Sequence, residues 1–455
     1  MRKNHSPWLH QLNKERKSER LRRDISVDVA IVGAGIAGVS TAFFTLKYTD
    51  KKVALLERHL LAHGATGHNG GQAVTYFEKG FAAMCEEFGI TLAATGQRSI
   101  ENTWELLDEI YTDANLDIFF ARFVGHMGLA SYAQVLDDLK NNHFRKQAGL
   151  RPDMLRISAS ASYVHDIPHE YAGLYSVVPQ AMMYQLLETK SPEYQAVLSE
   201  QKGVLNSALF CEKVVEYLLQ KYPDRFRLYE HASVDKLVLR HDQALLDVGT
   251  HTAKAERVVL CTNGFENMRI FNETGLDIDA KFHHLVRGTV GFMSGYLERL
   301  NKQPTALSYY GEGDRGPEAN YIYLTRRPYE YEKGTHHNLV SVGGPESALE
   351  EDTSYSFDSD YPDSAAEAID EFTKRVYDPD PNRKMEHVFT WHGLMGYTRN
   401  RIRMVGEEPQ NPVLLYNLGC NGVGLLPSIF GGRKIARHLA GETVPKSIFD
   451  IPKRY

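Results

Sequence analysis

The stretch Val27–Glu57 decides the fold of this chain: VDVAIVGAGIAGVSTAFFTLKYTDKKVALLE. Its first apolar run, residues 27–32, predicts a buried strand, and apolar side chains then recur at helical spacing. A second apolar run, residues 53–56, predicts the next strand. The turn between the first strand and the helix reads G-x-G-x-x-G. The stretch therefore predicts a βαβ unit of the kind that binds a dinucleotide.

The three glycines of this turn have separate roles. Gly33 permits the tight turn, Gly35 lets the backbone approach a pyrophosphate, and Gly38 lets helix and strand pack closely. The free N–H groups and the dipole at the helix start favour phosphate charge. Glu57 follows about 20 residues later, where an acid accepts hydrogen bonds from ribose hydroxyls. Because FAD and NAD use the same unit, this unit alone leaves the dinucleotide open.

Composition restricts the class of protein. The chain has 455 residues, enough for two or three domains, with 42% hydrophobic and 24% charged residues, as in ordinary globular enzymes. A net charge of −6 does not suggest nucleic-acid binding. No apolar run is long enough to span a membrane. The scattered cysteines indicate neither a zinc site nor a disulfide framework, and reduced thiols fit a cytoplasmic protein: Cys85, Cys211, Cys261 and Cys420.

The first 26 residues form a polar, basic arm without the apolar core of a signal peptide. Contact with an anionic membrane surface or with a partner protein is one interpretation of this charge. The favoured interpretation is a solvated arm that lies on the fold and is held there by Trp8 and Leu9.

Further glycine-rich segments follow the βαβ unit. The segment 64–72, GATGHNGGQ, is typical of a loop whose backbone comes close to a flat or charged group. The segment 257–261, RVVLC, predicts a buried strand followed by Thr262, Asn263 and Gly264, and ligands bind at such carboxyl ends. The run 413–418 predicts another strand, followed by a glycine turn at 419–424 and a helix over 425–439.

The remaining pattern suggests a second domain. Residues 282–345 contain strand-like runs without an intervening helix, which favours an antiparallel sheet. Elsewhere we expect a helix around 100–111, paired strands over 118–129, a helix over 132–141, an irregular insertion at 151–202, a helix capped by Asn206 or Ser207, short strands at 226–230, 234–239 and 244–248, and a helix capped by Ser364.

The chain resembles the FAD-dependent amine and amino-acid oxidase family that includes D-amino-acid oxidase, glycine oxidase and sarcosine oxidase. The motifs that carry the resemblance run in the family's order: VDVAIVGAGIAG, GATGHNGGQ, GVLNSALFCEKVVEYL, RVVLCTNGF, WHGLMGYTRNRIRMVGEE and NLGCNGVGLLPSIFGGRKIARHLAG. The GxNGGQ loop is similar to that of the γ-glutamylputrescine oxidase subgroup. The resemblance implies an α/β fold with a Rossmann-like FAD-binding domain (residues 27–115, 203–275 and 386–455) and an α+β substrate domain with an antiparallel sheet (116–202 and 276–385).

The same resemblance implies an FAD site made from separate segments. The first turn would hold the pyrophosphate, Glu57 the ribose, Val234 the adenine through its backbone, residues 66–72 the isoalloxazine and residues 419–425 its pyrimidine edge. The full expected set is Gly33, Gly35, Ile36, Ala37, Gly38, Glu57, Arg58, Ala65, Thr66, His68, Asn69, Gly70, Gly71, Gln72, Val234, Thr262, Asn263, Gly264, Gly419, Asn421, Gly422, Val423, Gly424 and Leu425.

Three positions depart from the family's pattern. Met395 stands where many members have an arginine for the substrate carboxylate, which favours an amine substrate; Arg326, Arg327 or Arg287 could replace that arginine. The strand expected at 338–343 lacks the lysine that assists oxygen in sarcosine oxidases. His68 falls where dimethylglycine dehydrogenases attach FAD covalently, although non-covalent FAD is the favoured interpretation.

The resulting hypothesis is an FAD-dependent oxidoreductase that converts a C–N bond of an amine or amino acid to an imine. Trp391, His392, Tyr323 and Arg326 are the expected residues of the substrate face. Three alternatives stay open: a dehydrogenase of N-methylated amino acids that passes electrons to an acceptor other than oxygen, an NAD(P)-dependent reductase, and a non-catalytic flavin-bound partner protein. No second G-x-G-x-x-G unit supports the reductase.

Overall fold

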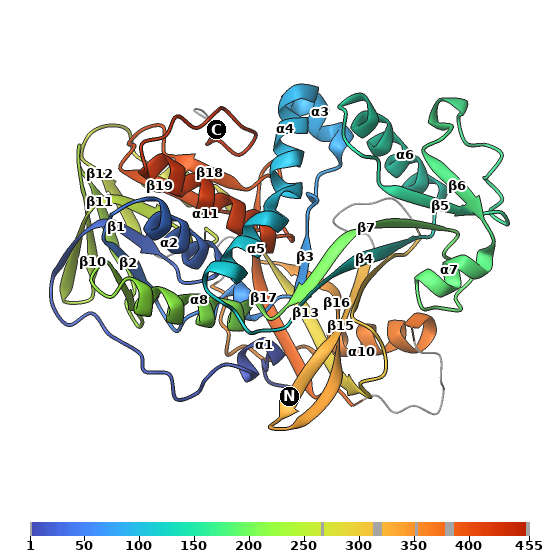
Figure 1. The fold of residues 1–455 in the computed structure, drawn as a ribbon, viewed down its shortest axis with the longest axis horizontal. Helices are drawn as coiled ribbons and strands as arrows, with labels where there is room; N and C mark the ends of the chain where they lie inside the picture. Colours follow the sequence, from blue (N-terminus) through green and yellow to red (C-terminus); the bar gives the residue numbers. More distant parts are fainter. Residues whose placement is uncertain (1, 265–267, 313–320, 351–353, 378–385, 452–455) are drawn as a thin grey trace.

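The computed structural model describes residues 2–264, 268–312, 321–350, 354–377 and 386–451. Two large β-sheets lie side by side, with the chain passing between them several times (Figure 1). The first, called here the nucleotide sheet, contains the strands of the predicted βαβ unit. The second, called here the antiparallel sheet, contains most of the strands from the middle of the chain. Among the described residues, no helix combines the length and apolar composition needed to cross a membrane.

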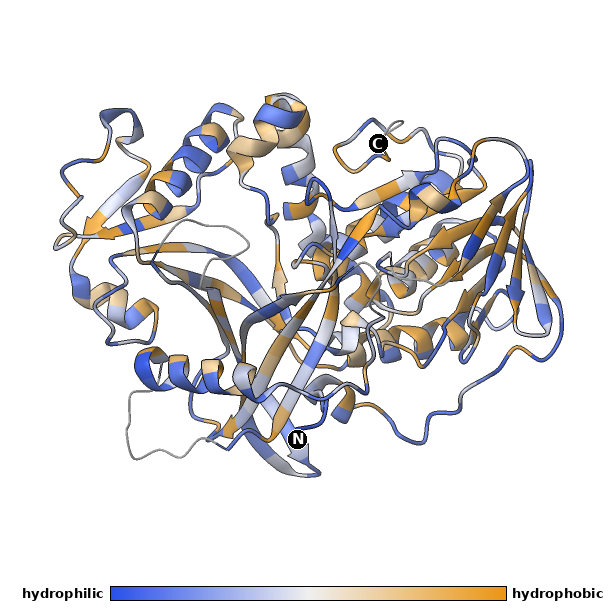
Figure 2. Ribbon diagram, turned by 180° about the vertical axis from the view of Figure 1, so that it is seen from behind, coloured by the Kyte–Doolittle hydropathy of each residue, from blue (hydrophilic) through white to orange (hydrophobic). Residues whose placement is uncertain are grey.

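The nucleotide sheet has a parallel centre, β8-β2-β1-β11-β19, and an antiparallel extension. Both faces of β1 are buried: Val29 and Ile31 pack toward the helices, and Ala30 and Val32 pack on the other side. Figure 2 accordingly shows these strands as largely hydrophobic. The strands are β1 (Ile25–Val32), β2 (Val53–Leu56), β8 (Phe226–Tyr229), β9 (Lys236–Leu239), β10 (Ala244–Val248), β11 (His251–Leu260), β12 (Arg269–Asn272), β18 (Met404–Glu407) and β19 (Leu414–Leu418).

Helices cover one face of this sheet. The predicted helices are confirmed as α2 (Ile36–Tyr48), α8 (Ser207–Lys221) and α11 (Leu425–Leu439), and Asn206 is the N-cap of α8 because its side chain accepts two backbone N–H groups. The helix expected around 100–111 is two helices, α4 (Ile90–Glu101) and α5 (Thr103–Asp113), separated at Asn102.

The antiparallel sheet has the order β17-β13-β16-β15-β14-β4-β7-β5-β6, with β3 beside β7. Two of its pairs, β14–β4 and β5–β6, are parallel. Its strands are β3 (Gln72–Val74), β4 (Phe120–Leu129), β5 (Met154–Ser158), β6 (Tyr175–Val178), β7 (Ala196–Leu205), β13 (Val286–Glu298), β14 (Thr305–Tyr310), β15 (Tyr321–Glu332), β16 (Thr335–Ala348) and β17 (Phe389–Thr398). The segments expected to build the FAD domain thus contribute β3 and β17 to the other sheet.

Three local predictions were wrong. Residues 120–129 form one continuous strand, because β4 pairs with β7 along its whole length despite Gly125 and Gly128. The segment 151–202 is no insertion, since its β7 lies inside the sheet. The helix near residue 364 begins at Asp363 after Pro362, and Ser364 does not cap it.

The remaining helices are short or lie at the edges of the molecule. They are α1 (Pro7–His10), α3 (Phe81–Phe88), α6 (Tyr132–Gln147), α7 (Gln180–Leu186), α9 (Asp279–Phe282), α10 (Asp363–Phe372), the 3₁₀ turns η1 (Ala65–Gly67) and η2 (His169–Tyr171), and the π turn η3 (Thr373–Tyr377).

Candidate functional site: a cavity between the two sheets

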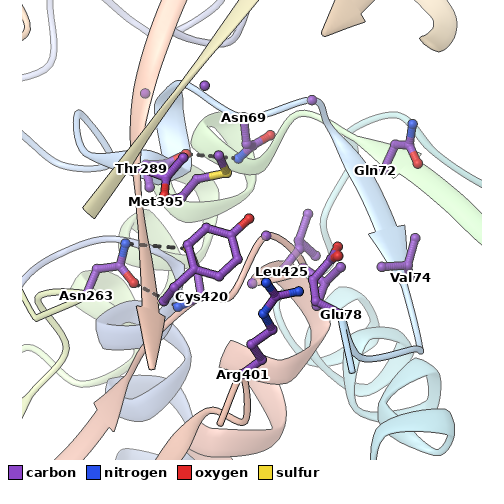
Figure 3. Close-up of a pocket in the computed structure, with 18 of the residues that line it drawn as sticks. Asn69, Gln72, Val74, Glu78, Asn263, Thr289, Met395, Arg401, Cys420 and Leu425 are labelled. Atoms are coloured by element: carbon purple, nitrogen blue, oxygen red, sulfur yellow. Dashed lines mark hydrogen bonds between the residues drawn. The ribbon is translucent and has the colours of Figure 1, made fainter. Parts of the chain in front are cut away.

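A cavity of about 1380 Å³ extends from the G-x-G-x-x-G turn to the antiparallel sheet. All of the expected FAD residues line it except four: Gly38, Gly264, Gly419 and Asn421. Figure 3 shows part of its wall, where Asn69, Asn263, Cys420 and Leu425 lie close together although they are far apart in sequence. Tertiary folding therefore brings the separate glycine-rich segments to one site.

The first turn, at Gly33 and Gly35, has no side chain between its backbone and the cavity. Gly33 has φ +99°, and a Cβ built on it would lie 2.7 Å from the carbonyl oxygen of Cys261. Gly38 faces the turn instead, since its added Cβ would lie 1.9 Å from the Gly33 oxygen. Gly38 therefore serves helix–strand packing, and Gly33 the turn itself. Thr66 reaches this turn from η1 and accepts the N–H of Ile36 at 3.0 Å.

Glu57 directly follows the last residue of β2 and lies at the wall of the cavity. Its carboxylate accepts the backbone N–H of Ala34 at 2.8 Å and that of His59 at 2.9 Å. Burial raises the pKa of Glu57, while these two hydrogen bonds oppose the shift. The turn, the acid and the following segment are consequently fixed to one another before any ligand binds.

The glycine loop 64–72 is organised by Asn69. The Asn69 Nδ2 donates to the carbonyl of Thr66 and to the Oγ of Ser207, both at 2.8 Å, and its Oδ1 accepts the Gly71 N–H at 2.7 Å. The neighbouring His68 is buried, and its Nδ1 lies 3.0 Å from the Gly64 carbonyl oxygen. Burial lowers the pKa of His68 to about 4, so the ring is neutral at pH 7.

Two further segments close the cavity from the other side. Asn263, with φ +65°, accepts the Cys420 N–H at 2.9 Å, which ties the end of β11 to the tail turn. Asn421 points into the protein and accepts the Thr398 N–H at 2.8 Å. Among the described residues, the buried hydroxyl of Thr262 has no hydrogen-bond partner. Helix α11 starts at Leu425 without a side-chain cap.

These residues fit FAD. The bare turn and the N-terminus of α2 suit a pyrophosphate, Glu57 suits a ribose, and the uncapped start of α11 suits an acceptor group that gains negative charge. Thr262 offers a hydroxyl that nothing in the described protein uses. The cavity is also long enough to continue past these groups into the antiparallel sheet.

The four residues expected at the substrate face have different positions. Tyr323 lines the cavity, and burial raises its pKa. Arg326 does not, because its guanidinium forms two hydrogen bonds with Glu188, at 2.6 and 2.7 Å. Trp391 is fully buried behind the glycine loop, and His392 is held by the hydroxyl of Tyr355.

The expected replacements for the missing arginine are not in the cavity wall either. Arg327 is buried against Trp8, and Arg287 does not line the cavity. The arginines that line it are Arg58, Arg145, Arg375, Arg401 and Arg403. Of these, Arg401 (Figure 3) is the one whose charge lowers the pKa of Glu346 in the same wall. It follows Met395 closely in the sequence, within the quoted motif, but it is one of three alternating arginines, Arg399, Arg401 and Arg403, and no local pattern singles it out.

Sequence reasoning also missed an acidic pair in the wall. Glu78 and Glu346 both line the cavity, together with Tyr397. Desolvation and the charge of Glu78 raise the pKa of Glu346 to about 7, and Arg401 opposes the shift. Only the alternation of β15 could have indicated this region, since it places Tyr321 and Tyr323 on the same face.

Comparisons with known proteins agree with this arrangement. A probable oxidoreductase, OrdL, of Haemophilus influenzae is 31% identical over 112 residues, 25% of each chain. The γ-glutamylputrescine oxidoreductase of Escherichia coli is 32% identical over 88 residues, 19% of this chain and 20% of that protein. The matched segments thus span only a quarter or a fifth of these relatives.

Solved structures match over nearly the whole chain. Glycine oxidase from Geobacillus kaustophilus superposes with a TM-score of 0.65 at 16% identity, covering 94% of this chain and 99% of that one. L-Amino acid deaminase from Proteus vulgaris gives 0.63 at 14% identity, covering 98% and 97%. These likenesses show the fold. The model of the DAO family, described as FAD dependent oxidoreductase, matches residues 28–438. The chain therefore belongs to the DAO family of FAD-dependent oxidoreductases.

Proposed function

We propose that the protein oxidises the C–N bond of an amine or amino acid to an imine, which water then hydrolyses. FAD supplies the acceptor for the hydride that leaves the carbon next to nitrogen. The observation that carries the proposal is the continuity of the cavity, which joins the dinucleotide turn at Gly33 to the wall formed by Tyr323, Met395 and Glu346. A substrate in the second part would face the reactive end of a dinucleotide in the first.

The names of similar proteins support this reaction class. The solved structures that share the fold include a glycine oxidase, an L-proline dehydrogenase from P. horikoshii and an L-amino acid deaminase. The L-proline dehydrogenase superposes with a TM-score of 0.64 at 14% identity. Each of these names describes chemistry at a carbon bound to nitrogen.

The charges in the wall favour an amine. An ammonium group is attracted by carboxylates and by the faces of aromatic rings, and this wall offers Glu78, Glu346 and Tyr323. We propose that Glu346 accepts the proton that the substrate nitrogen must lose before it can give up hydride. A carboxyl group with a pKa of about 7 suits that transfer at neutral pH.

Arg401 extends the range of substrates. Its guanidinium is the planar donor that binds a carboxylate best, and it lies in the same wall as Glu346. Many family members have an arginine at the position of Met395. We propose that Arg401 performs the role of that arginine for any substrate that carries an acid group. The wall therefore suits an amine with a separate carboxylate as well as a simple amine.

Anaerobic reduction tests the proposal. The purified FAD-loaded protein is mixed with a panel of primary, secondary and N-methylated amines and of amino acids, and the flavin absorbance is followed. We expect at least one amine to bleach the flavin. Once an electron acceptor is added, each flavin should transfer more than one electron pair to it, because the enzyme turns over. If no compound with a C–N bond bleaches the flavin, the proposed function is wrong.

The electron acceptor is a separate question. Residues 338–343 of β16 carry no lysine, which favours a dehydrogenase with an acceptor other than oxygen. Mixing the reduced protein with oxygen measures this directly. Slow reoxidation by oxygen together with fast reoxidation by an artificial quinone would support the dehydrogenase; fast reoxidation by oxygen would make the protein an oxidase.

We propose that FAD is bound without a covalent link. Although His68 lines the cavity, its Nδ1 is engaged by the Gly64 carbonyl. Acid precipitation should therefore leave the yellow colour in the supernatant. A yellow pellet that becomes colourless in His68→Ala would show a covalent attachment at this histidine.

A further inference from the structure

The N-terminal segment Asn4–Asn13 lies behind the glycine loop rather than simply on the surface. Ser6 donates to the Gly67 carbonyl at 2.5 Å, and Trp8 is fully buried at the start of α1. The segment continues to β17, where the backbone of His5 donates to Thr390 at 2.7 Å. It therefore connects the glycine loop with the antiparallel sheet.

Two indole rings hold one carbonyl group of this loop. The Nε1 of Trp8 donates to the carbonyl oxygen of Asn69 at 2.5 Å, and the Nε1 of Trp391 donates to the same oxygen at 3.3 Å. The rings meet edge to face, with centroids 6.3 Å apart. Neither ring lines the cavity, whereas Asn69 and Gly70 do. The Asn69 carbonyl is thus drawn to the side of the loop away from the cavity.

The position of the Asn69 carbonyl also fixes the direction of the Gly70 N–H. Because the peptide between Asn69 and Gly70 is planar and trans, its N–H points opposite to its carbonyl. The Gly70 N–H is therefore directed to the cavity side of the loop. Within the described part of the chain, no protein group accepts this N–H, while the next donor, Gly71 N–H, is already bound by the Asn69 Oδ1.

The loop also has no room to move back. A Cβ on Gly71 would lie 2.6 Å from Cη2 of Trp8, and one on Gly67 would lie 2.5 Å from Cδ2 of Leu9. The guanidinium of Arg327 lies over the Trp8 ring, 5.0 Å from its centroid. Trp8 is fully buried between these neighbours, and the loop rests directly on it.

We propose that Trp8 and Trp391 are positioning residues for FAD: by holding the Asn69 carbonyl, they aim the Gly70 N–H at the flavin ring. The proposal uses FAD binding and does not depend on the substrate. It assigns a role in cofactor binding to a tryptophan outside the dinucleotide motifs.

The variant Trp8→Phe tests the proposal, because it keeps a large apolar ring and removes the N–H. The matched control is Trp104→Phe: Trp104 is also buried in the core, and its Nε1 has no hydrogen-bond partner among the described residues. FAD affinity of the apoprotein is measured by titration, and the visible spectrum of the bound flavin is recorded.

We expect Trp8→Phe to weaken FAD binding about tenfold, as for one lost hydrogen bond, and to shift the flavin absorption maxima. Trp104→Phe should change neither. A wild-type affinity and spectrum in Trp8→Phe, or equal changes in both variants, would overturn the proposal.

If Trp8→Phe does not fold, Trp391→Phe provides the answer. It removes the longer of the two hydrogen bonds, so we expect a spectral shift in the same direction and a loss of affinity of about threefold. A Trp391→Phe protein whose flavin spectrum equals that of the wild type would contradict the assignment of both rings.

Discussion

Replacing Gly33 by alanine should disable the dinucleotide turn. The backbone there has φ +99°, a conformation that costs a residue with a side chain about 1–3 kcal/mol. The new Cβ would also lie 2.7 Å from the oxygen and 3.0 Å from the carbon of the Cys261 carbonyl. Because these are backbone atoms, they cannot rotate away, and overpacking of this kind adds about 1–3 kcal/mol. The expected total is about 2–6 kcal/mol.

This cost can appear in two places. If the turn keeps its shape, the apoprotein loses stability. If the turn relaxes, the N–H groups at the start of α2 move away from the pyrophosphate, and each 1.4 kcal/mol then lowers FAD affinity about tenfold. Urea unfolding of the apoprotein and FAD titration of the folded protein measure the two parts. The loss of unfolding free energy and the loss of FAD-binding free energy should together equal the predicted total.

Gly249→Ala is the matched control. Gly249 lies in the β10–β11 turn with φ +58°, and an added Cβ would have nothing within 4 Å. It therefore isolates the conformational cost, about 1–2 kcal/mol, and should leave FAD affinity unchanged. If the summed loss for Gly33→Ala is no larger than that for Gly249→Ala, the close contact with Cys261 does not act as described.

Three further predictions concern charged groups. Arg326→Ala should destabilise the protein by about 2 kcal/mol in urea unfolding, less than a fully buried pair because the Glu188 side chain is 31% exposed; an unchanged midpoint would contradict the ion pair. The pKa of His68, about 4 in the folded protein against 6.5 normally, means that the unfolded chain binds more protons between these values. The unfolding free energy of the apoprotein should consequently decrease as pH falls from about 6.5 to about 4, by up to about 3 kcal/mol from this group. His68→Asn should weaken this pH dependence. Equal slopes of unfolding free energy against pH in the two proteins would refute the prediction. Glu346→Gln should lower kcat/KM for amines at least tenfold and remove the limb of the pH profile near 7, whereas the same change at Glu350, which does not line the cavity, should do neither.

The nucleotide-binding part could be predicted from the sequence because its information is local. A buried parallel strand needs a continuous apolar run, and a turn without side chains needs glycine at fixed spacing. The limits of β2 and α11 agree with the prediction, and β1 ends at Val32 as expected. The residues of these glycine turns reach the cavity because each turn follows a strand of one parallel sheet.

The antiparallel sheet was less predictable because its partners are distant in the chain. Nothing local in Gly125 or Gly128 indicates that β4 continues through them; pairing with β7 decides it. A distant partner also explains why Arg326 does not line the cavity. Its sequence neighbourhood suggested a carboxylate-binding arginine, but Glu188 neutralises it from another part of the chain.

The sequence by itself predicted a dinucleotide site at Gly33, Gly35 and Glu57, since the needed backbone and charge lie within one short segment. Only the tertiary structure decided what lies at the other end. Glu346 and Arg401 meet in one wall, and Trp8 meets Asn69 behind it, through contacts between segments separated by tens to hundreds of residues. Local pattern fixes secondary structure and turns, whereas the pairing of buried charges and donors depends on which surfaces the fold brings together.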